Sequence, residues 1–337
     1  MRRAWSTVFF CLLLLISVVA SGATHPTLRF SLPPVLEALP IAFADSWGLF
    51  DERGIDVDLI GFSDPDERSA ALQTGHVDGL ISDVTHAILD ESTGIRLVIT
   101  GAAQSQPQTG SQALTLLSPA SFRIDTLQQL LASRQLIGVL QRSDYEFMLD
   151  QLVEQTDGGD VRTAQYSLFT DILQLATMLG AQWVGSAVLP EPYVSYIATY
   201  APPGAEPLRL VKLSHFDGIS LPPALVLFRE SYVKDHPDVV RAFLDVYNEA
   251  AARLNDMPRE ELVQTGLEVA VSLFFQAANT DLIGQDVLNA IPIPTFEPLG
   301  TLSAEEYGKI ADWVIQKGYL YGVPPAYDGF VDWQYLP

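Results

Sequence analysis

The stretch "LQTGHVDGLISD", Leu72 to Asp83, shows the unit from which the predicted fold is built. A helical run ends at a glycine, an apolar segment follows over Gly79–Ile81, and polar residues return at Ser82. This order is typical of a helix, a buried strand and the start of the next helix. A rougher version, "LATMLGAQWVGSAVLPEP", recurs at Leu175 to Pro192. Because the pattern occurs once in each half of the chain, it indicates two similar structural units.

Strands and helices alternate on both sides of this stretch. Short apolar runs and period-two alternation predict strands over 27–33, 54–62, 76–81, 95–103, 135–141, 161–167 and 185–190. Helices are predicted from near Pro40, over 63–72, 82–94, 125–133, 143–155, 170–179 and 192–200, and from Pro237 onward. Such alternation predicts mainly parallel sheets with helices on both faces. Ligands bind outside the carboxyl ends of the strands in such sheets, so two facing sheets would hold a ligand between them.

The N-terminal segment has the layout of a secretory signal. Arg2 and Arg3 precede an apolar run over 8–20, and small residues up to Ala23 follow it. The run is shorter than the roughly 20 residues of a membrane span, although a retained anchor remains the alternative. Cys11, the only cysteine, lies inside this segment and lacks the flanking residues of a lipid-attachment site. We therefore expect a soluble periplasmic protein that is cleaved after Ala23 and carries no disulfide or reactive thiol.

The composition and the motif content argue against several function classes. The chain has 337 residues, 48% of them hydrophobic, which suffices for two globular domains. Its net charge of −22 repels nucleic acid and anionic membranes. The five histidines lack metal-ligand spacing, and "SYVK", Ser231 to Lys234, lacks the partner motifs of penicillin-interacting enzymes. We therefore expect no catalytic residue, metal, cofactor or nucleic-acid partner, and a monomeric protein.

Five ordered segments carry a resemblance to a known family. They are "FADSWGLFDERGIDVDLIGF" at 43–62, "AALQTGHVDGLISDVTHAI" at 70–88, "LIGVLQRSDYEFML" at 136–149, "AVLPEPYVSYI" at 187–197 and "LVLFRESYVKDHPDVVRAFLDVYNEA" at 225–250. The chain resembles the periplasmic substrate-binding proteins of the nitrate, sulfonate and taurine type, which serve ABC importers and are related to the thiamine-pyrimidine-precursor synthase branch. The resemblance extends from Thr27 to about Tyr319.

The resemblance implies the type II fold of periplasmic binding proteins, an α/β fold. Two α/β lobes would be joined by a two-strand hinge, with a ligand cleft between them. After a signal peptide over 1–23, lobe I would comprise 24–112 and 225–337, and lobe II 113–224. The hinge strands would fall near 113–117 and 224–228.

The resemblance also implies a function. The protein would capture a small anionic or zwitterionic organic solute, such as a sulfonate, a nitrate-type anion, or a pyrimidine-like or amino-acid-like molecule, and deliver it to a membrane permease. Two departures leave the ligand open: Gln182–Gly185 replaces the Gly-x-Val-Asp that the family repeats, and the cysteine cluster of the synthase branch is missing. An enzyme of that synthase type, or a receptor domain that signals without transport, are the alternatives.

The segment "RSDYE", Arg142 to Glu146, is the most informative polar stretch. Ser143 and Glu146 have the spacing of a capping box. In the functional interpretation, Arg142 and the free N–H groups of a helix start bind an anion, whereas Asp144 would suit an amine. Tyr145 could pack against an apolar part of the ligand. If Arg142 makes a charged hydrogen bond, its replacement by alanine should weaken an anionic ligand by roughly 1.5–3 kcal/mol.

The remaining candidate ligand-binding residues are chosen by position. Ser82, Asp83 and Thr85 stand where a strand meets a helix, and capping of that helix explains them equally well. The other candidates follow predicted strands or flank the expected hinge: Ser31, Glu37, Thr109, Gly110, Glu191, Tyr193 and Asp217.

Overall fold

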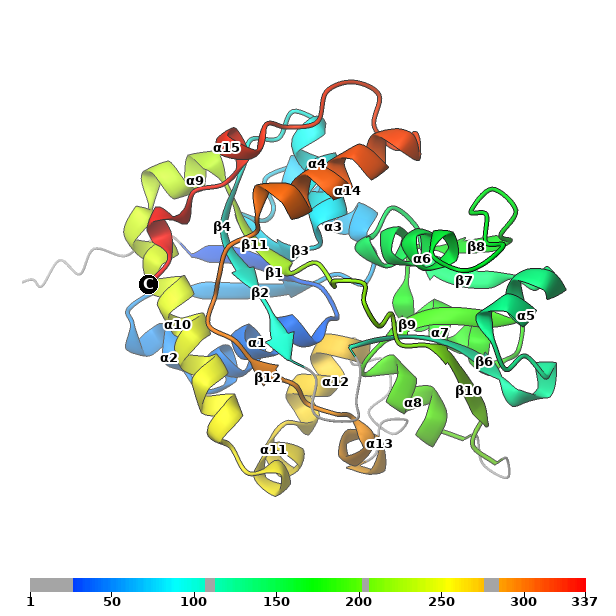
Figure 1. Cartoon of the computed structure of the whole chain (residues 1–337). Helices are drawn as coiled ribbons and strands as arrows, with labels where there is room; N and C mark the ends of the chain where they lie inside the picture. Colours follow the sequence, from blue (N-terminus) through cyan, green and yellow to red (C-terminus); the bar gives the residue numbers. More distant parts are fainter. Residues whose placement is uncertain (1–26, 107–112, 202–205, 276–284) are drawn as a thin grey trace, which may run out of the picture.

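The computed structural model describes residues 27–106, 113–201, 206–275 and 285–337 (Figure 1). The predicted signal peptide over 1–23 and the candidates Thr109 and Gly110 lie outside the described residues. Within the described ranges, no helix combines the length and the apolar character that a membrane span requires.

The first sheet has five strands in the order β2-β1-β3-β11-β4. They are β1 (Leu28–Leu32), β2 (Val57–Gly61), β3 (Gly79–Ser82), β4 (Leu97–Ala103) and β11 (Ala224–Arg229). β1 pairs in parallel with β2 and β3, whereas β11 pairs antiparallel with β3 and β4. This sheet and its helices are called lobe I below.

The second sheet has five strands in the order β10-β6-β9-β7-β8. They are β6 (Leu114–Pro119), β7 (Ile137–Leu140), β8 (Tyr166–Phe169), β9 (Ser186–Pro190) and β10 (Leu210–Ser214). β7 pairs in parallel with β8 and β9, and β6 pairs antiparallel with β9 and β10. This sheet and its helices are called lobe II. A short pair, β5 (Ser105–Gln106) and β12 (Thr295–Phe296), forms a third sheet.

The helices flank the two large sheets, which lie side by side (Figure 1). In the first part of the chain they are the 3-10 turn η1 (Leu36–Ala38), α1 (Leu39–Ser46), α2 (Leu49–Glu52), α3 (Pro65–Gln73) and α4 (Val84–Ser92). Those of lobe II are η2 (Ala120–Phe122), α5 (Leu127–Ser133), α6 (Asp144–Glu154), α7 (Ile172–Gly180) and α8 (Tyr193–Thr199). The C-terminal third adds α9 (Glu230–Asp235), α10 (Pro237–Asp256), α11 (Arg259–Thr265), α12 (Leu267–Phe275), α13 (Gln285–Ala290), α14 (Ala304–Gln316), α15 (Tyr327–Phe330) and η4 (Trp333–Tyr335).

The amphipathic pattern of α10 explains how the C-terminal third attaches to lobe I. Val240, Phe243 and Tyr247 recur at the spacing of one helical face and are fully buried. The ring centroids of Phe243 and Phe30 on β1 lie 4.4 Å apart, which is a favourable aromatic contact. The predicted alternation of strands and helices is confirmed, as is the helical character after Pro237.

The chain crosses between the two large sheets directly before the predicted hinge strands. The expected hinge strands, 113–117 and 224–228, fall largely within β6 and β11, which are inner strands of their own sheets. Each crossing precedes its strand: the first lies between β4 and β6, partly outside the described residues, and the second lies over 215–223, before β11. β6 and most of β11 are buried, as inner strands are. Pro222 and Pro223 lack the N–H groups that a strand ladder needs, so they stay in the crossing. The exact lobe boundaries remain a prediction.

Candidate functional site

A pocket of about 110 Å³ lies between the lobes, with walls drawn from both. Pro33 and Ser82, at the ends of β1 and β3, contribute from lobe I, and Leu140 and Pro190, at the ends of β7 and β9, contribute from lobe II. The carboxyl ends of parallel strands meet at one edge of a sheet, and here the two edges face a shared space. Pro222 of the second crossing also lines it.

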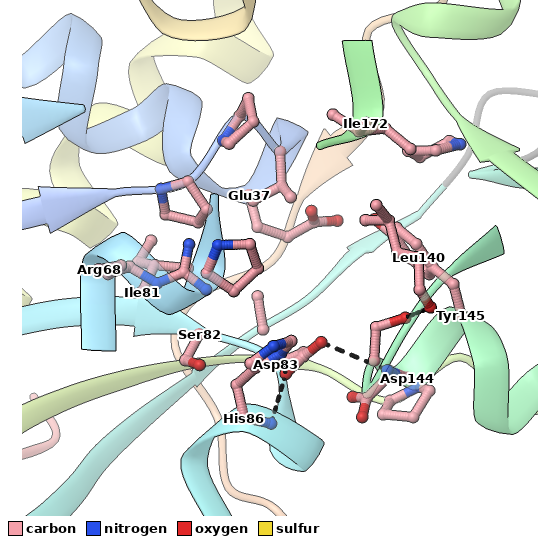
Figure 2. Close-up of a pocket in the computed structure, with 18 of the residues that line it drawn as sticks. Glu37, Arg68, Ile81, Ser82, Asp83, His86, Leu140, Asp144, Tyr145 and Ile172 are labelled. Carbon is pink, nitrogen blue, oxygen red and sulfur yellow. Dashed lines mark hydrogen bonds and ion pairs between the residues drawn. The ribbon is translucent and has the colours of Figure 1, made fainter. Parts of the chain in front are cut away.

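The start of helix α4 is the point where the lobes meet beside the pocket. Asp83 caps this helix, accepting a hydrogen bond from the His86 N–H at 2.7 Å, and its carboxylate lies 2.8 Å from the His86 ring (Figure 2). Asp144 reaches across from lobe II and accepts hydrogen bonds from the N–H groups of Val84 and Thr85 at 3.0 Å. It also accepts one from the Thr85 hydroxyl at 2.6 Å. One helix start is therefore capped by two carboxylates, one from each lobe.

The two carboxylates differ in how their environment affects protonation. Burial, together with the nearby charge of Asp83, raises the pKa of Asp144 to about 7, although the hydrogen bonds from Thr85 and Val84 oppose this. Burial also acts to raise the pKa of Asp83, but His86 and Arg68 outweigh it and the pKa is lowered. Burial acts to lower the pKa of His86, but the attraction and the hydrogen bond of Asp83 outweigh it, so the pKa is raised. The site thus contains a charged Asp83–His86 pair and an acid that titrates near neutrality.

Glu37 and Tyr145 face the pocket from opposite lobes. Figure 2 shows the Glu37 carboxyl group extending toward Tyr145 and Leu140. This carboxylate accepts a hydrogen bond from the Ser105 hydroxyl at 2.8 Å, and burial raises its pKa. Burial also raises the pKa of the Tyr145 phenol, next to the charge of Glu37. Within the described residues the Tyr145 hydroxyl has no hydrogen-bond partner, so it can donate to a ligand.

Arg68 on α3 is the most unusual group in the pocket wall. The residue is only 4% exposed, and burial lowers the pKa of its guanidinium against the attraction of Asp83, Asp90 and Asp64. In the part of the chain that the structure describes, this guanidinium makes no hydrogen bond or ion pair. The hydroxyl of Ser82, on the same wall, is also buried without a partner among the described residues. Buried polar groups are normally paired, so both are available to hydrogen-bond with a molecule in the pocket.

The structure brings six of the predicted candidates to the pocket. They are Glu37, Ser82, Asp83, Ser143, Asp144 and Tyr145. Thr85 lies behind the wall, bonded to Asp144, and Ser31 is buried in β1 with a hydroxyl that lacks a partner among the described residues. Ligand binding by all eight remains a prediction.

Four predicted candidates lie away from the pocket wall. Arg142 is turned outward, its side chain 47% exposed and 3.9 Å from Asp66. The carboxylate of Glu191 accepts from the Ser195 N–H at 3.0 Å inside lobe II. The hydroxyl of Tyr193 donates to the Phe274 carbonyl at 2.9 Å in the core, and Asp217 is exposed on the second crossing.

The predicted capping box at α6 forms only in part. The Ser143 hydroxyl accepts from the Glu146 N–H at 3.3 Å, as expected for a cap. The reciprocal bond differs, because the Glu146 carboxylate accepts from the N–H of Arg142 at 2.8 Å and not from that of Ser143. The left-handed backbone of Arg142, with φ of 53°, brings this N–H into position and directs the side chain away.

Arg68 and His86 were missed by the sequence prediction. A signal for Arg68 exists, since it precedes the fully buried Leu72 by one helical turn on α3. An arginine on the apolar face of a helix has to find a polar partner. His86 follows its capping Asp83 by three residues, which is within reach of an ion pair at a helix start.

Comparisons with known proteins agree with this geometry. The sequence profile of the family described as NMT1/THI5 like matches residues 36–261, more than half of the chain. A search of curated protein sequences found no match.

Three solved structures illustrate the similarity of the fold. The alkanesulfonate-binding protein SsuA from Xanthomonas axonopodis pv. citri, bound to MOPS, has a TM-score of 0.69 at 17% identity, covering 92% of this chain and 99% of that one. The periplasmic aliphatic sulphonate-binding protein SsuA from Escherichia coli gives 0.68 at 17% identity, with 93% and 99% covered. The periplasmic nitrate-binding protein NrtA from Synechocystis PCC 6803 gives 0.63 at 11% identity, with 92% and 86% covered. The chain thus has the fold of periplasmic binding proteins, as predicted.

Proposed function

We propose, on the premise that the chain belongs to the NMT1/THI5-like family, that it is an extracytoplasmic solute-binding protein of an ABC importer. It would capture a small organic solute in the pocket between the lobes and present it to a membrane permease. The observation that carries the proposal is the pocket wall, which both lobes build and in which buried polar groups lack partners. We also propose that the mature protein is a periplasmic monomer from which the signal peptide, residues 1–23, has been cleaved.

Closure of the two lobes is the proposed mechanism of capture. Arg68 and Glu37 on lobe I and Tyr145 on lobe II would contact the same small molecule. A solute that contacts both lobes stabilises the closed arrangement more than the open one, and so shifts the population toward it. The permease would then distinguish loaded from empty protein by lobe arrangement.

Native mass spectrometry of the purified mature protein tests this function. We expect a bound small molecule that is lost on unfolding and rebinds after refolding. Small-angle scattering should then give a smaller radius of gyration with the molecule than without it. A protein that retains no molecule from a cell extract, or that keeps one shape with and without it, would contradict solute capture.

We further propose that the protein releases its solute unchanged. The solved structures of similar fold are described as binding proteins for sulfonates and nitrate, which supports binding without chemistry. The chain also resembles proteins that are related to a synthase branch, so enzymatic turnover of the bound molecule has to be measured. Recovery of an altered molecule after prolonged incubation would favour an enzyme on the same fold.

A further inference from the structure

We infer that the pocket selects a small zwitterionic solute, whose anionic end pairs with Arg68 and whose ammonium end pairs with Glu37. This inference rests on the proposed function and names the class of solute that the same pocket takes. It is narrower than an anion-binding site, because it assigns a separate charged partner to each end of the molecule.

The state of Arg68 argues for an anionic group in the ligand. A buried guanidinium is unfavourable unless charged hydrogen bonds replace its water. Arg68 is 4% exposed, faces the pocket, and makes no such bond within the described residues. A carboxylate or sulfonate could accept two parallel N–H bonds from it. The buried Ser82 hydroxyl, which has no partner among the described residues, offers a further donor on the same wall.

Glu37 argues for a positive group at a different point of the same pocket. Among the described residues its carboxylate has only neutral donors, the Ser105 hydroxyl at 2.8 Å and its own backbone N–H. Figure 2 shows Arg68 beside Ile81, while the carboxyl group of Glu37 extends in the direction of Tyr145. The two side chains therefore present opposite charges to separate parts of one cavity. An ammonium group of the ligand would compensate the negative charge of Glu37, in the same way that an anionic group would compensate the positive charge of Arg68.

The charge balance of the pocket favours a zwitterion over a simple anion. Asp83 pairs with His86, and Asp144 accepts three hydrogen bonds at α4, so these acids already have partners. Arg68 and Glu37 together are neutral, and a zwitterion preserves that neutrality. A simple anion would pair with Arg68 but leave the buried Glu37 carboxyl group uncompensated.

The pocket wall between the charged groups determines the middle of the solute. Apolar side chains dominate there, among them Val35, Ile81, Leu140 and Ile172. They can contact methylene groups but cannot hydrogen-bond to polar ones. The cavity of about 110 Å³ limits the solute to a small molecule. A short ω-amino acid or aminoalkanesulfonate has this chemistry.

Matched ligands test the inference by calorimetry on the mature protein after removal of bound solute. The probes are ω-amino acids of two to six carbons, their aminoalkanesulfonate counterparts, and for each the acid without the amine and the amine without the acid. We expect at least one zwitterion to bind about 10-fold or more tightly than both of its matched partners, as a lost charged hydrogen bond implies.

Three variants locate the two ends of the solute. Arg68→Met should weaken the zwitterion about 10-fold or more, while the melting temperature of the empty protein stays the same or rises because a buried unpaired charge is removed. Glu37→Gln should make the zwitterion bind no more tightly than its amine-free acid. Glu67→Gln changes the charge at an exposed position on the same helical turn, so affinity should stay within about twofold.

The outcomes separate this inference from the proposed function. An acid that binds as tightly as its zwitterion and closes the lobes would overturn the inference and leave solute capture intact. The same holds if Arg68→Met keeps full affinity, or if no probe binds while native mass spectrometry finds a retained molecule that is not zwitterionic. A protein that neither retains nor binds any solute would overturn both.

Discussion

Helix α6 contributes buried acids to two regions between the lobes, and these regions differ in how completely their polar groups are paired. Asp144, at its first turn, faces the pocket and α4, whereas Glu146 and Asp150 face α14 and the segment after it. The second region, called the α6–α14 network, consists of Glu146, Asp150, Tyr166, Trp313, Lys317 and Tyr319.

All four carboxylate oxygens of the α6–α14 network have donors. The Lys317 amine lies 3.1 Å from Glu146 Oε1 and 2.7 Å from Asp150 Oδ2. The Trp313 ring N–H donates to Asp150 Oδ2 at 2.8 Å, and the Tyr166 hydroxyl donates to Oδ1 at 2.9 Å. The Tyr319 hydroxyl contacts both Glu146 oxygens, at 2.8 and 2.9 Å. Such a satisfied network leaves nothing for a ligand to supply.

The pocket region has the opposite character. Arg68 and the Ser82 hydroxyl lack partners among the described residues, and two acids from different lobes share the start of α4. Buried groups of the same kind therefore serve two purposes, and the completeness of their pairing distinguishes them. Complete pairing joins the lobes, whereas incomplete pairing is found in the pocket that we propose for the solute.

Removing the cation of the α6–α14 network should have the largest effect. Lys317→Met leaves Glu146 and Asp150 as buried acids without their ion-pair partner. We expect the free energy of unfolding to fall by about 3 kcal/mol, measured by urea denaturation, because breaking a buried ion pair leaves uncompensated charge. The control is Lys309→Met on α14, since its pair with Glu305 at 2.7 Å is exposed. It should lower the free energy of unfolding far less than Lys317→Met does. If both variants lose the same free energy of unfolding, the buried network contributes no more to stability than an exposed ion pair does.

The titration of Asp144 should have an effect of intermediate size on the free energy of unfolding. Burial and Asp83 raise its pKa from 3.8 to about 7, so the folded protein holds this proton more tightly than the unfolded chain does. The contribution of the group to stability is then present below about pH 4 and is lost as pH rises through about 7. Between those limits we expect wild type to lose about 1 kcal/mol per pH unit relative to Asp144→Asn, measured by urea denaturation.

Two comparisons determine whether Asp144 is responsible. Asp171→Asn alters another capping carboxylate, on α7, and serves as the control for the loss of an acidic cap. It shows how much of the effect of Asp144→Asn comes from the loss of an acidic cap alone. If the difference between wild type and Asp144→Asn is constant from pH 5 to pH 8, the cross-lobe acid does not titrate in this range.

Arg142→Ala should have the smallest effect, although the sequence favoured this residue as the anion site. Its side chain is 47% exposed and 3.9 Å from an exposed Asp66, and its guanidinium lies 6.0 Å from the Tyr319 ring centroid. We expect changes of less than about 1 kcal/mol in both stability and solute affinity. Calorimetry with a bound solute measures this. A tenfold loss of affinity would return Arg142 to the site and weaken the assignment of Arg68.

Local sequence patterns predicted the order of elements and the location of the pocket edge, because both follow from short-range periodicity and capping chemistry. Ser82 and Asp83 were found this way, since a strand end and a helix cap can be seen within a few residues. The place of Arg68 in the pocket could not be found, because that pocket is also lined by segments such as 33–35 and 221–224, which are distant in sequence. The outward position of Arg142 could not be predicted either, because it depends on a left-handed backbone conformation that a single sequence does not specify.

The two cross-lobe contacts of α6 also set how the molecule can move. Asp144 and Asp150 are six residues apart on one helix, which is about 9 Å along its axis. In the proposed mechanism of capture, lobe II would rotate about the contact of Lys317, because its buried ion pairs hold the lobes together there. The hydrogen bonds of Asp144 to α4 would then break first, and the proposed solute would leave on that side of the molecule.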